Sequence, residues 1–228
     1  MEQSRKRLFI DRKTNAWQMV ETIKWAANNG YDAIVFSLGE KLGVNSRYIK
    51  LAKRYELVIE AGGRDFPLLL PRRLFFFHRD LFRMEHGKRK ASHHFCPTNP
   101  ETTAIIAERA GYLFARSMKI MTVPRVFHLL PDEKHENNWC ACPACRAFTP
   151  AEQNLIAVSA AADVLARLDP DARLSFFDYG EGQEAEGIAP RGNMFRLDKI
   201  NLLNRYLLLR DSNIRRNKLI IAVSAEAT

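Results

Sequence analysis

Two adjacent carboxylates, Asp132 and Glu133, follow an apolar segment that ends at Leu130. Carboxylates at the end of a buried strand are costly to desolvate unless they take part in chemistry. Hydrolysis of a glycosidic bond commonly needs one carboxylic acid that protonates the leaving oxygen and a second group that supplies or stabilises the nucleophile. Asp178 and Glu181, after the next apolar segment, could provide that second group. The alternative is an exposed acidic loop, which is common in proteins.

Three cysteines follow the acidic pair in the pattern C-x-C-x-x-C, at Cys140, Cys142 and Cys145. Four cysteines in a chain of this size do not indicate a disulfide scaffold. Three thiolates on one tight loop could bind zinc with a fourth ligand, and such a closed site would be structural. We expect that catalysis requires no cofactor. The alternative is that reduced thiols pack the loop. The candidates for the fourth ligand are Cys96, His128 and His135.

Other residues near the predicted strand ends could contact a substrate. Gly62 and Gly63 precede Arg64 and Asp65, and glycines at such a place let a ligand approach the backbone closely. Asp65 could hydrogen-bond a sugar hydroxyl, and a plain tight turn capped by this aspartate fits the pattern equally well. The candidate substrate-binding residues are Arg64, Asp65, His128, Trp139, Tyr179 and Glu181.

A run of cations and aromatics, RRLFFFHR, extends from Arg72 to Arg79. Such a run could form a sugar-stacking platform or a surface on which nucleic-acid bases stack. A more common arrangement places the phenylalanines in the core and the arginines at its rim.

The apolar spacing predicts alternating strands and helices that would position these residues. Strands are expected at 7–11, 32–38, 57–61, 123–130 and 174–179, and helices at 15–29, 46–55, 100–117 and 151–168. This order favours right-handed βαβ units and a parallel sheet. Function in such folds lies at the carboxyl ends of the strands, where the acidic pair, Asp65 and Asp178 fall. A long excursion over 64–94 interrupts the alternation.

The net charge of +9 is spread unevenly along the 228 residues. Segment 71–94 has seven basic and two acidic side chains, and 191–218 has eight and two, whereas 131–190 has four and eleven. A uniformly basic surface would indicate a nucleic-acid partner. A basic surround for an acidic segment is less typical of one, so nucleic acid is disfavoured. No run approaches 18 apolar residues, and we therefore expect no membrane partner.

Three segments, 62–89, 94–102 and 126–154, together resemble a bacterial glycosidase-like family known as domain of unknown function 4838. The resemblance covers roughly residues 5–195. It implies a (β/α)8 barrel related to α-glucuronidases and family-20 hexosaminidases, and family members are often secreted. In hexosaminidase-like barrels an Asp-Glu pair follows strand four. The resemblance thus implies that Glu133 is the general acid and that Asp132 orients a substrate acetamido group that acts as nucleophile.

The resemblance also shows where this chain departs from the family. The family pattern has Asp-Asp or Asn-Asp at the acidic pair and a histidine in place of Arg64, so Asp132 is the better supported residue. Nothing family-like follows 195. We therefore expect a barrel portion over 1–195 and a divergent tail over 196–228, with a helix at 197–209 and a strand at 218–223. A complete (β/α)8 barrel needs about 250 residues. The fold class expected is α/β, an incomplete TIM-barrel-like fold of five to six βα units.

The functional hypothesis is a glycoside hydrolase-like protein that acts on or binds a carbohydrate. The alternative is a non-catalytic carbohydrate-binding or remnant barrel fragment, and a basic nucleic-acid-binding protein ranks third. The start of the chain, Met1 to Lys13, has no apolar segment typical of a signal peptide. The sequence determines neither the compartment nor the oligomeric state.

Overall fold

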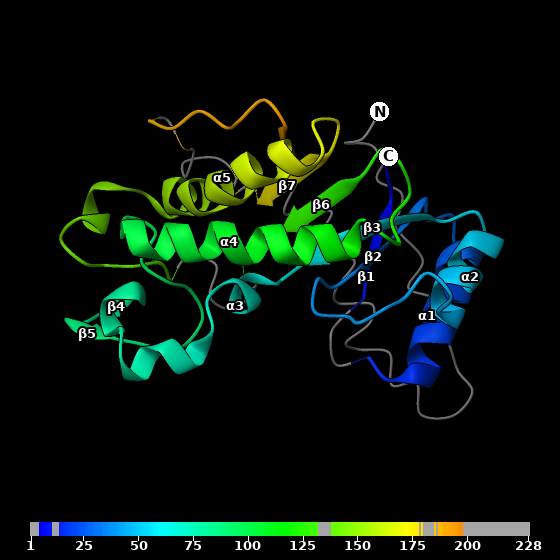
Figure 1. The fold of residues 1–228 in the computed structure, drawn as a ribbon, viewed down its shortest axis with the longest axis horizontal. Helices are drawn as coiled ribbons and strands as arrows, with labels where there is room; N and C mark the ends of the chain where they lie inside the picture. Colours follow the sequence, from blue (N-terminus) through cyan, green and yellow to red (C-terminus); the bar gives the residue numbers. More distant parts are fainter. Residues whose placement is uncertain are drawn as a thin grey trace, which may run out of the picture.

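A parallel six-stranded sheet forms the centre of the molecule in the computed structural model (Figure 1). The structure describes residues 5–10, 14–131, 138–177, 179, 185 and 187–197. The strand order is β1-β2-β3-β6-β7-β8, which is also the order along the chain. The strands are β1 (Arg7–Phe9), β2 (Ala33–Phe36), β3 (Val58–Gly63), β6 (Val126–Leu129), β7 (Arg173–Phe177) and β8 (Met194–Leu197).

Helices cross over between successive strands from β1 to β7, and each begins at a side chain suited to cap it. They are α1 (Ala16–Asn28), α2 (Arg47–Arg54), α4 (Pro100–Ser117) and α5 (Pro150–Leu168). Asn15 and Thr149 form capping boxes, the latter with Glu152, and Asn99 caps the helix that Pro100 opens. Figure 1 shows α4 and α5 side by side over β6 and β7, with α1 and α2 near the opposite part of the sheet.

The excursion between β3 and α4 folds into short elements packed beside the main sheet. They are α3 (Phe66–Leu69), the 3-10 turns η1 (Arg72–Phe76) and η2 (Arg79–Leu81), and the antiparallel hairpin of β4 (Met84–Glu85) and β5 (Lys88–Arg89). A further 3-10 turn, η4 (Cys145–Ala147), precedes α5. Phe75 packs edge-to-face on Phe82, whereas Phe76 and Phe77 are exposed. The expectation that this phenylalanine run is core is therefore wrong for two of its three members.

The sheet is strongly curled, and contacts across its inner face measure the curl. In a flat sheet the edge strands β1 and β8 would lie about 24 Å apart, because neighbouring strands are about 4.8 Å apart. Yet the Arg7 guanidinium of β1 lies 5.7 Å from the ring centre of Phe195 in β8. Phe9 of β1 likewise reaches His128 of β6, with ring centres 5.2 Å apart. The fold is thus an incomplete, TIM-barrel-like half-barrel with its interior filled by side chains.

Two apolar clusters cover the two faces of this sheet. The larger one fills the space between the outer face and the helices, where Leu8, Ile34, Ile59, Phe127 and Leu174 point outward. The smaller one lies on the inner face and includes Phe9, Val35, Phe177 and Leu197. Alternation of side chains along each strand separates the two sets.

The structure confirms the predicted α/β class and the five predicted strands within a few residues. It adds β8, which the sequence did not predict as a strand; Leu197, expected to begin a helix, ends this strand instead. The remainder of the expected helix over 197–209 and the strand over 218–223 lie outside the described residues. The division at 195 therefore stays a prediction. No helix of the described chain is long and apolar enough to cross a bilayer.

Candidate active site

The carboxyl ends of β2, β3 and β6 lead into residues that the sequence indicated. β2 leads into Ser37, β3 into Arg64 and Asp65, and β6 into Leu130 and Pro131. The structural description does not include Asp132, Glu133, His135, Asp178 or Glu181. Their roles stay predictions.

Asp65 is buried and ties the ends of β2 and β3 together. The hydroxyl of Ser37 donates to its Oδ1 at 2.7 Å, and the backbone N–H of Leu38 donates to its Oδ2 at 2.8 Å. Both carboxylate oxygens thus accept hydrogen bonds from the neighbouring loop. Asp65 holds the loop after β2 in place, and its predicted contact with a sugar hydroxyl stays untested.

Trp139 and Tyr179, both proposed as substrate contacts, meet each other. The indole Nε1–H donates to the Tyr179 hydroxyl at 2.8 Å, which joins the loop after β6 to the end of β7. Trp139 also stacks on His94, with ring centres 4.3 Å apart and planes 4° from parallel. Phe66 and Phe95 pack edge-to-face against the same indole. These buried rings form one aromatic cluster that connects the loop after β6 with the excursion after β3.

All four cysteines come together in one buried cluster. Cys96 Sγ lies 3.7 Å from Cys142 Sγ and 3.6 Å from Cys145 Sγ, and all four sulfurs lie within 4.8 Å of one another. Sulfurs bonded to one another would be about 2.05 Å apart. Tetrahedral zinc with Zn–S bonds of about 2.3 Å would place them about 3.8 Å apart. A metal ion could therefore bind between these four sulfurs.

Neighbouring groups fix the cysteine loop and favour a thiolate at one of the four cysteines, Cys96. Gln153 of α5 accepts from the backbone N–H of Cys140 and donates to the carbonyls of Cys140 and Cys145. The backbone N–H of Met84 donates to Cys140 Sγ at 3.2 Å. Hydrogen bonds with Cys140 and Cys145 hold the pKa of the Cys96 thiol far below its usual range, whereas hydrogen bonds with Cys140 and Cys96 raise the pKa of the Cys145 thiol. A thiolate is the form that binds a metal.

Comparison with known proteins supports the fold class. No family model matches the chain, and no curated protein matches it. A solved structure of GH20 catalytic modules from the pneumococcal exo-β-D-N-acetylglucosaminidase StrH is similar at a TM-score of 0.58 and 10% identity, covering 86% of this chain and 59% of that one. This chain is similar in fold to glycoside hydrolase barrels. It spans somewhat over half the length of that structure.

Two α-galactosidase structures are more distant. The GH36 enzyme AgaB from Geobacillus stearothermophilus has a TM-score of 0.47 at 11% identity, covering 79% of this chain and 28% of that chain. The enzyme from Lactobacillus brevis has a TM-score of 0.48 at 8% identity, with the same coverage of both chains.

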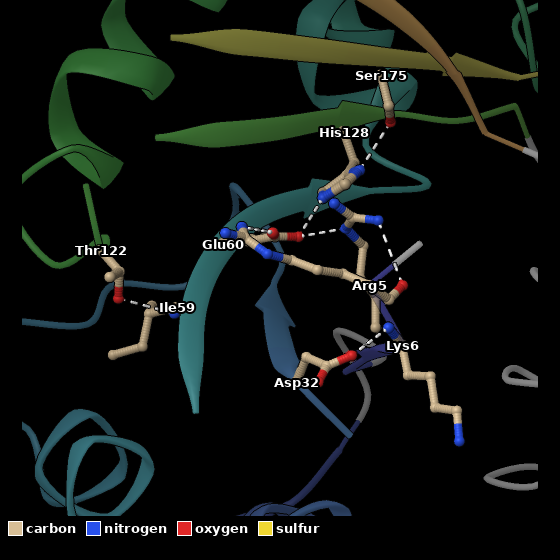
Figure 2. Close-up of polar contacts among 9 residues, drawn as sticks. Arg5, Lys6, Asp32, Ile59, Glu60, Thr122, His128 and Ser175 are labelled. Carbon is tan, nitrogen blue, oxygen red and sulfur yellow. Dashed lines mark hydrogen bonds and ion pairs between the residues drawn. The ribbon is translucent and has the colours of Figure 1, made fainter. Parts of the chain in front are cut away.

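A buried polar network on the inner face contains residues that the sequence did not single out (Figure 2). Glu60 of β3 accepts from Arg7 Nε at 2.7 Å and contacts His128 Nε2 at 2.8 Å. His128 Nδ1 in turn lies 2.7 Å from the hydroxyl of Ser175. Arg5 Nη1 reaches the other oxygen of Glu60 at 3.3 Å. Side chains from β1, β3, β6 and β7 are thereby connected across the concave face.

Electrostatics determine the protonation of this network. Burial alone would raise the pKa of Glu60, but the hydrogen bond from His128 and the charge of Arg7 lower it to about 2. Burial lowers the pKa of His128. An ionised Glu60 can only accept, so a neutral His128 carries its proton on Nε2, and its Nδ1 accepts from Ser175. His128, predicted as a substrate contact or a metal ligand, thus has both nitrogens engaged inside the half-barrel.

One sequence signal could have found this network. Glu60 is the single charged residue in the strand VIEAGG, and an ionisable group in the middle of a buried strand requires partners. The identity of those partners is not encoded locally, because Arg7 and His128 come from two other strands.

Proposed function

We propose that this protein is a glycoside hydrolase-like enzyme whose acid/base carboxylates follow β6. The observation that carries the proposal is the fold: a half-barrel similar to a GH20 catalytic module, in which β6 is the fourth strand of the sheet. The sequence places Asp132 and Glu133 directly after this strand, and Asp178 directly after the neighbouring β7. The described strands that precede these carboxylates, β6 and β7, pair with each other.

The reaction proposed is hydrolysis of a terminal N-acetyl-β-D-glucosaminide, the activity named for the GH20 structure. Glu133 as the acid gives its proton to the glycosidic oxygen while the acetamido oxygen, oriented by Asp132, attacks C1 and the glycosidic bond breaks. Water then attacks C1 and opens the cyclic intermediate. Its proton passes to the Glu133 carboxylate, which returns the acid to its first state.

The test is release of p-nitrophenol from aryl N-acetyl-β-D-glucosaminide. We expect Asp132→Asn and Glu133→Gln to lower kcat/KM by at least about 100-fold, because each removes a group of the acid-base chemistry. Asp171→Asn is the matched control, because Asp171 is an exposed carboxylate in the turn before β7. Circular dichroism and thermal unfolding should show that the variants fold. Unchanged kcat/KM in both site variants would refute the assignment.

A non-catalytic carbohydrate-binding domain is the alternative, and one observation favours it. In the described part of the chain, β1 and β8 each pair with one neighbour and not with each other. Such a half-barrel would bind a sugar without turnover. Native gel electrophoresis through immobilised glycan distinguishes the two: retardation that Asp132→Asn does not change, together with no product release, would identify the binding module.

We further propose that the cysteine cluster holds a structural zinc ion. The support is the set of four buried sulfurs within 4.8 Å of one another, two of whose separations, 3.7 and 3.6 Å, are close to those of a tetrahedral zinc site. Cys96, from a separate part of the chain, supplies the fourth ligand in place of His128 or His135. The ion would join the excursion after β3 to the loop that follows the acidic pair.

Metal analysis of the purified protein tests this second proposal. We expect one zinc per chain, and cobalt exchanged into the site should give the visible absorption of a tetrahedral thiolate complex. Cys142→Ser should lose the metal and lower the thermal midpoint. Ala144→Ser is the control, since it introduces the same side chain at an exposed position of the same loop. A metal-free wild-type protein that unfolds at the same temperature after zinc addition would refute the site.

A further inference from the structure

Two neighbouring phenylalanines project into solvent from the excursion after β3. Phe76 is 77% exposed and Phe77 is 86% exposed, although the preceding Phe75 packs onto Phe82. Exposed single apolar side chains are common, but two adjacent large aromatics with this exposure need an explanation. Packing of the fold does not explain their exposure, because neither ring contributes to the two described apolar clusters.

We call this exposed pair the Phe76–Phe77 knuckle, because it lies where the backbone turns at the end of η1. Phe76 ends the 3-10 turn η1 and Phe77 follows it as the C-cap. A 3-10 turn has about three residues per turn, so successive side chains point about 120° apart. Two rings that diverge in this way do not form a flat platform. Stacking of successive bases instead uses a groove lined by aromatic rings.

The same excursion carries four exposed cations. Arg73, Arg79, Lys88 and Lys90 are exposed. The acidic residues of segment 71–94 are partly engaged: Asp80 accepts from Asn99, and Glu85 pairs with Arg83 at 3.2 Å. In Figure 1 the β4–β5 hairpin lies at one end of the molecule and α1 and α2 lie at the other. An exposed apolar pair on a segment that also carries exposed cations complements a surface that is negative outside and apolar beneath.

We propose that the Phe76–Phe77 knuckle docks onto an anionic phospholipid surface. The two rings enter the boundary between headgroups and acyl chains, and the four exposed cations contact lipid phosphates. Reversible membrane binding generally needs two such signals, buried apolar area and attraction to anionic lipids. The expectation of no membrane partner rested on the lack of a long apolar run, which concerns spanning segments and not surface docking.

Co-sedimentation of the full chain with lipid vesicles tests the proposal. We expect the protein to sediment with vesicles of phosphatidylcholine and phosphatidylglycerol at low salt, and to stay in solution with phosphatidylcholine alone. The double variant Phe76→Ser/Phe77→Ser should reduce the bound fraction at least tenfold, and Lys88→Glu/Lys90→Glu should reduce it severalfold. Tyr112→Ser is the matched control, because Tyr112 is an exposed aromatic on α4. It should bind as the wild type does.

A second measurement locates the contact. In Phe77→Trp, lipids brominated on their acyl chains should quench the fluorescence of the added tryptophan. Adding Phe76→Ser to this variant should weaken the quenching. Binding to mixed vesicles that the double phenylalanine variant retains would overturn the proposal. Failure to bind any vesicle would also overturn it. Tight binding to single-stranded DNA or to a polyuronate that depends on the same two phenylalanines would overturn it as well. Circular dichroism checks that each variant is folded.

Discussion

His128 and Glu60 face each other on the inner side of the half-barrel, with Nε2 and Oε2 2.8 Å apart and both side chains fully buried. The two residues belong to neighbouring strands, β6 and β3. The carboxylate also pairs with Arg7 of β1, which makes Glu60 the centre of the network. A side chain that connects three strands should contribute strongly to stability once its partners are buried with it.

Removing the charge of Glu60 should destabilise the fold. Glu60→Gln keeps the size of the side chain but leaves the buried Arg7 guanidinium without its counter-ion. We expect a loss of about 3–5 kcal/mol in the free energy of unfolding, measured by urea denaturation. Glu21→Gln is the control, because Glu21 forms an exposed pair with Lys24 and should change stability by less than about 0.5 kcal/mol. Equal effects of the two changes would contradict the network's role.

Acidification should weaken the same network. Both groups have pKa values lowered by folding, so both contribute stability above their unfolded pKa values that is lost as the pH falls. For His128 the loss begins below about 6.5, and for Glu60 it runs from about pH 5 towards about pH 2. We expect Glu60 to account for about 2 kcal/mol of the decrease between pH 7 and pH 3. Urea unfolding of Glu60→Gln at the two pH values should show a correspondingly smaller decrease.

The hydrogen bond between Trp139 and Tyr179 should be measurable by itself. Tyr179→Phe leaves the buried indole N–H without this acceptor, and we expect a loss of about 1–3 kcal/mol. The change should also shift the fluorescence emission of the folded protein, because the environment of Trp139 changes. Tyr112→Phe, at an exposed position, serves as the control and should leave both readouts unchanged. A stable Tyr179→Phe protein with unaltered emission would argue against this contact.

Gly62 should tolerate no side chain. Its φ is +123°, and an added Cβ would overlap the backbone of His128 on the neighbouring strand. We expect Gly62→Ala to cost at least about 2 kcal/mol through overlap and backbone strain. Gly43→Ala, where the surrounding space is open, should be nearly neutral. Thermal unfolding of the two variants checks this, and similar midpoints would mean that β3 and β6 pack less closely than the structure shows.

The regular elements of this protein could be predicted from local sequence. Capping residues such as Asn15 and Thr149, with Pro100 and Pro150 behind their caps, define where the helices begin. Apolar runs between the helices predict buried parallel strands. β8 was missed because it has four residues, MFRL, with an exposed arginine inside the strand. So short a pattern does not distinguish a strand from a helix start.

The candidate site could likewise be predicted only in part from local sequence. C-x-C-x-x-C shows by spacing alone that three thiols share a loop, but Cys96 is distant in sequence and only the packing of the excursion against that loop made it the fourth member. Arg7, Glu60, His128 and Ser175 come from four strands, and their meeting depends on register and curl. Local sequence determines which residues enter a strand and on which face they lie. Only tertiary structure decided which of them touch, because contacts across a curled sheet depend on how every strand is aligned with its neighbour.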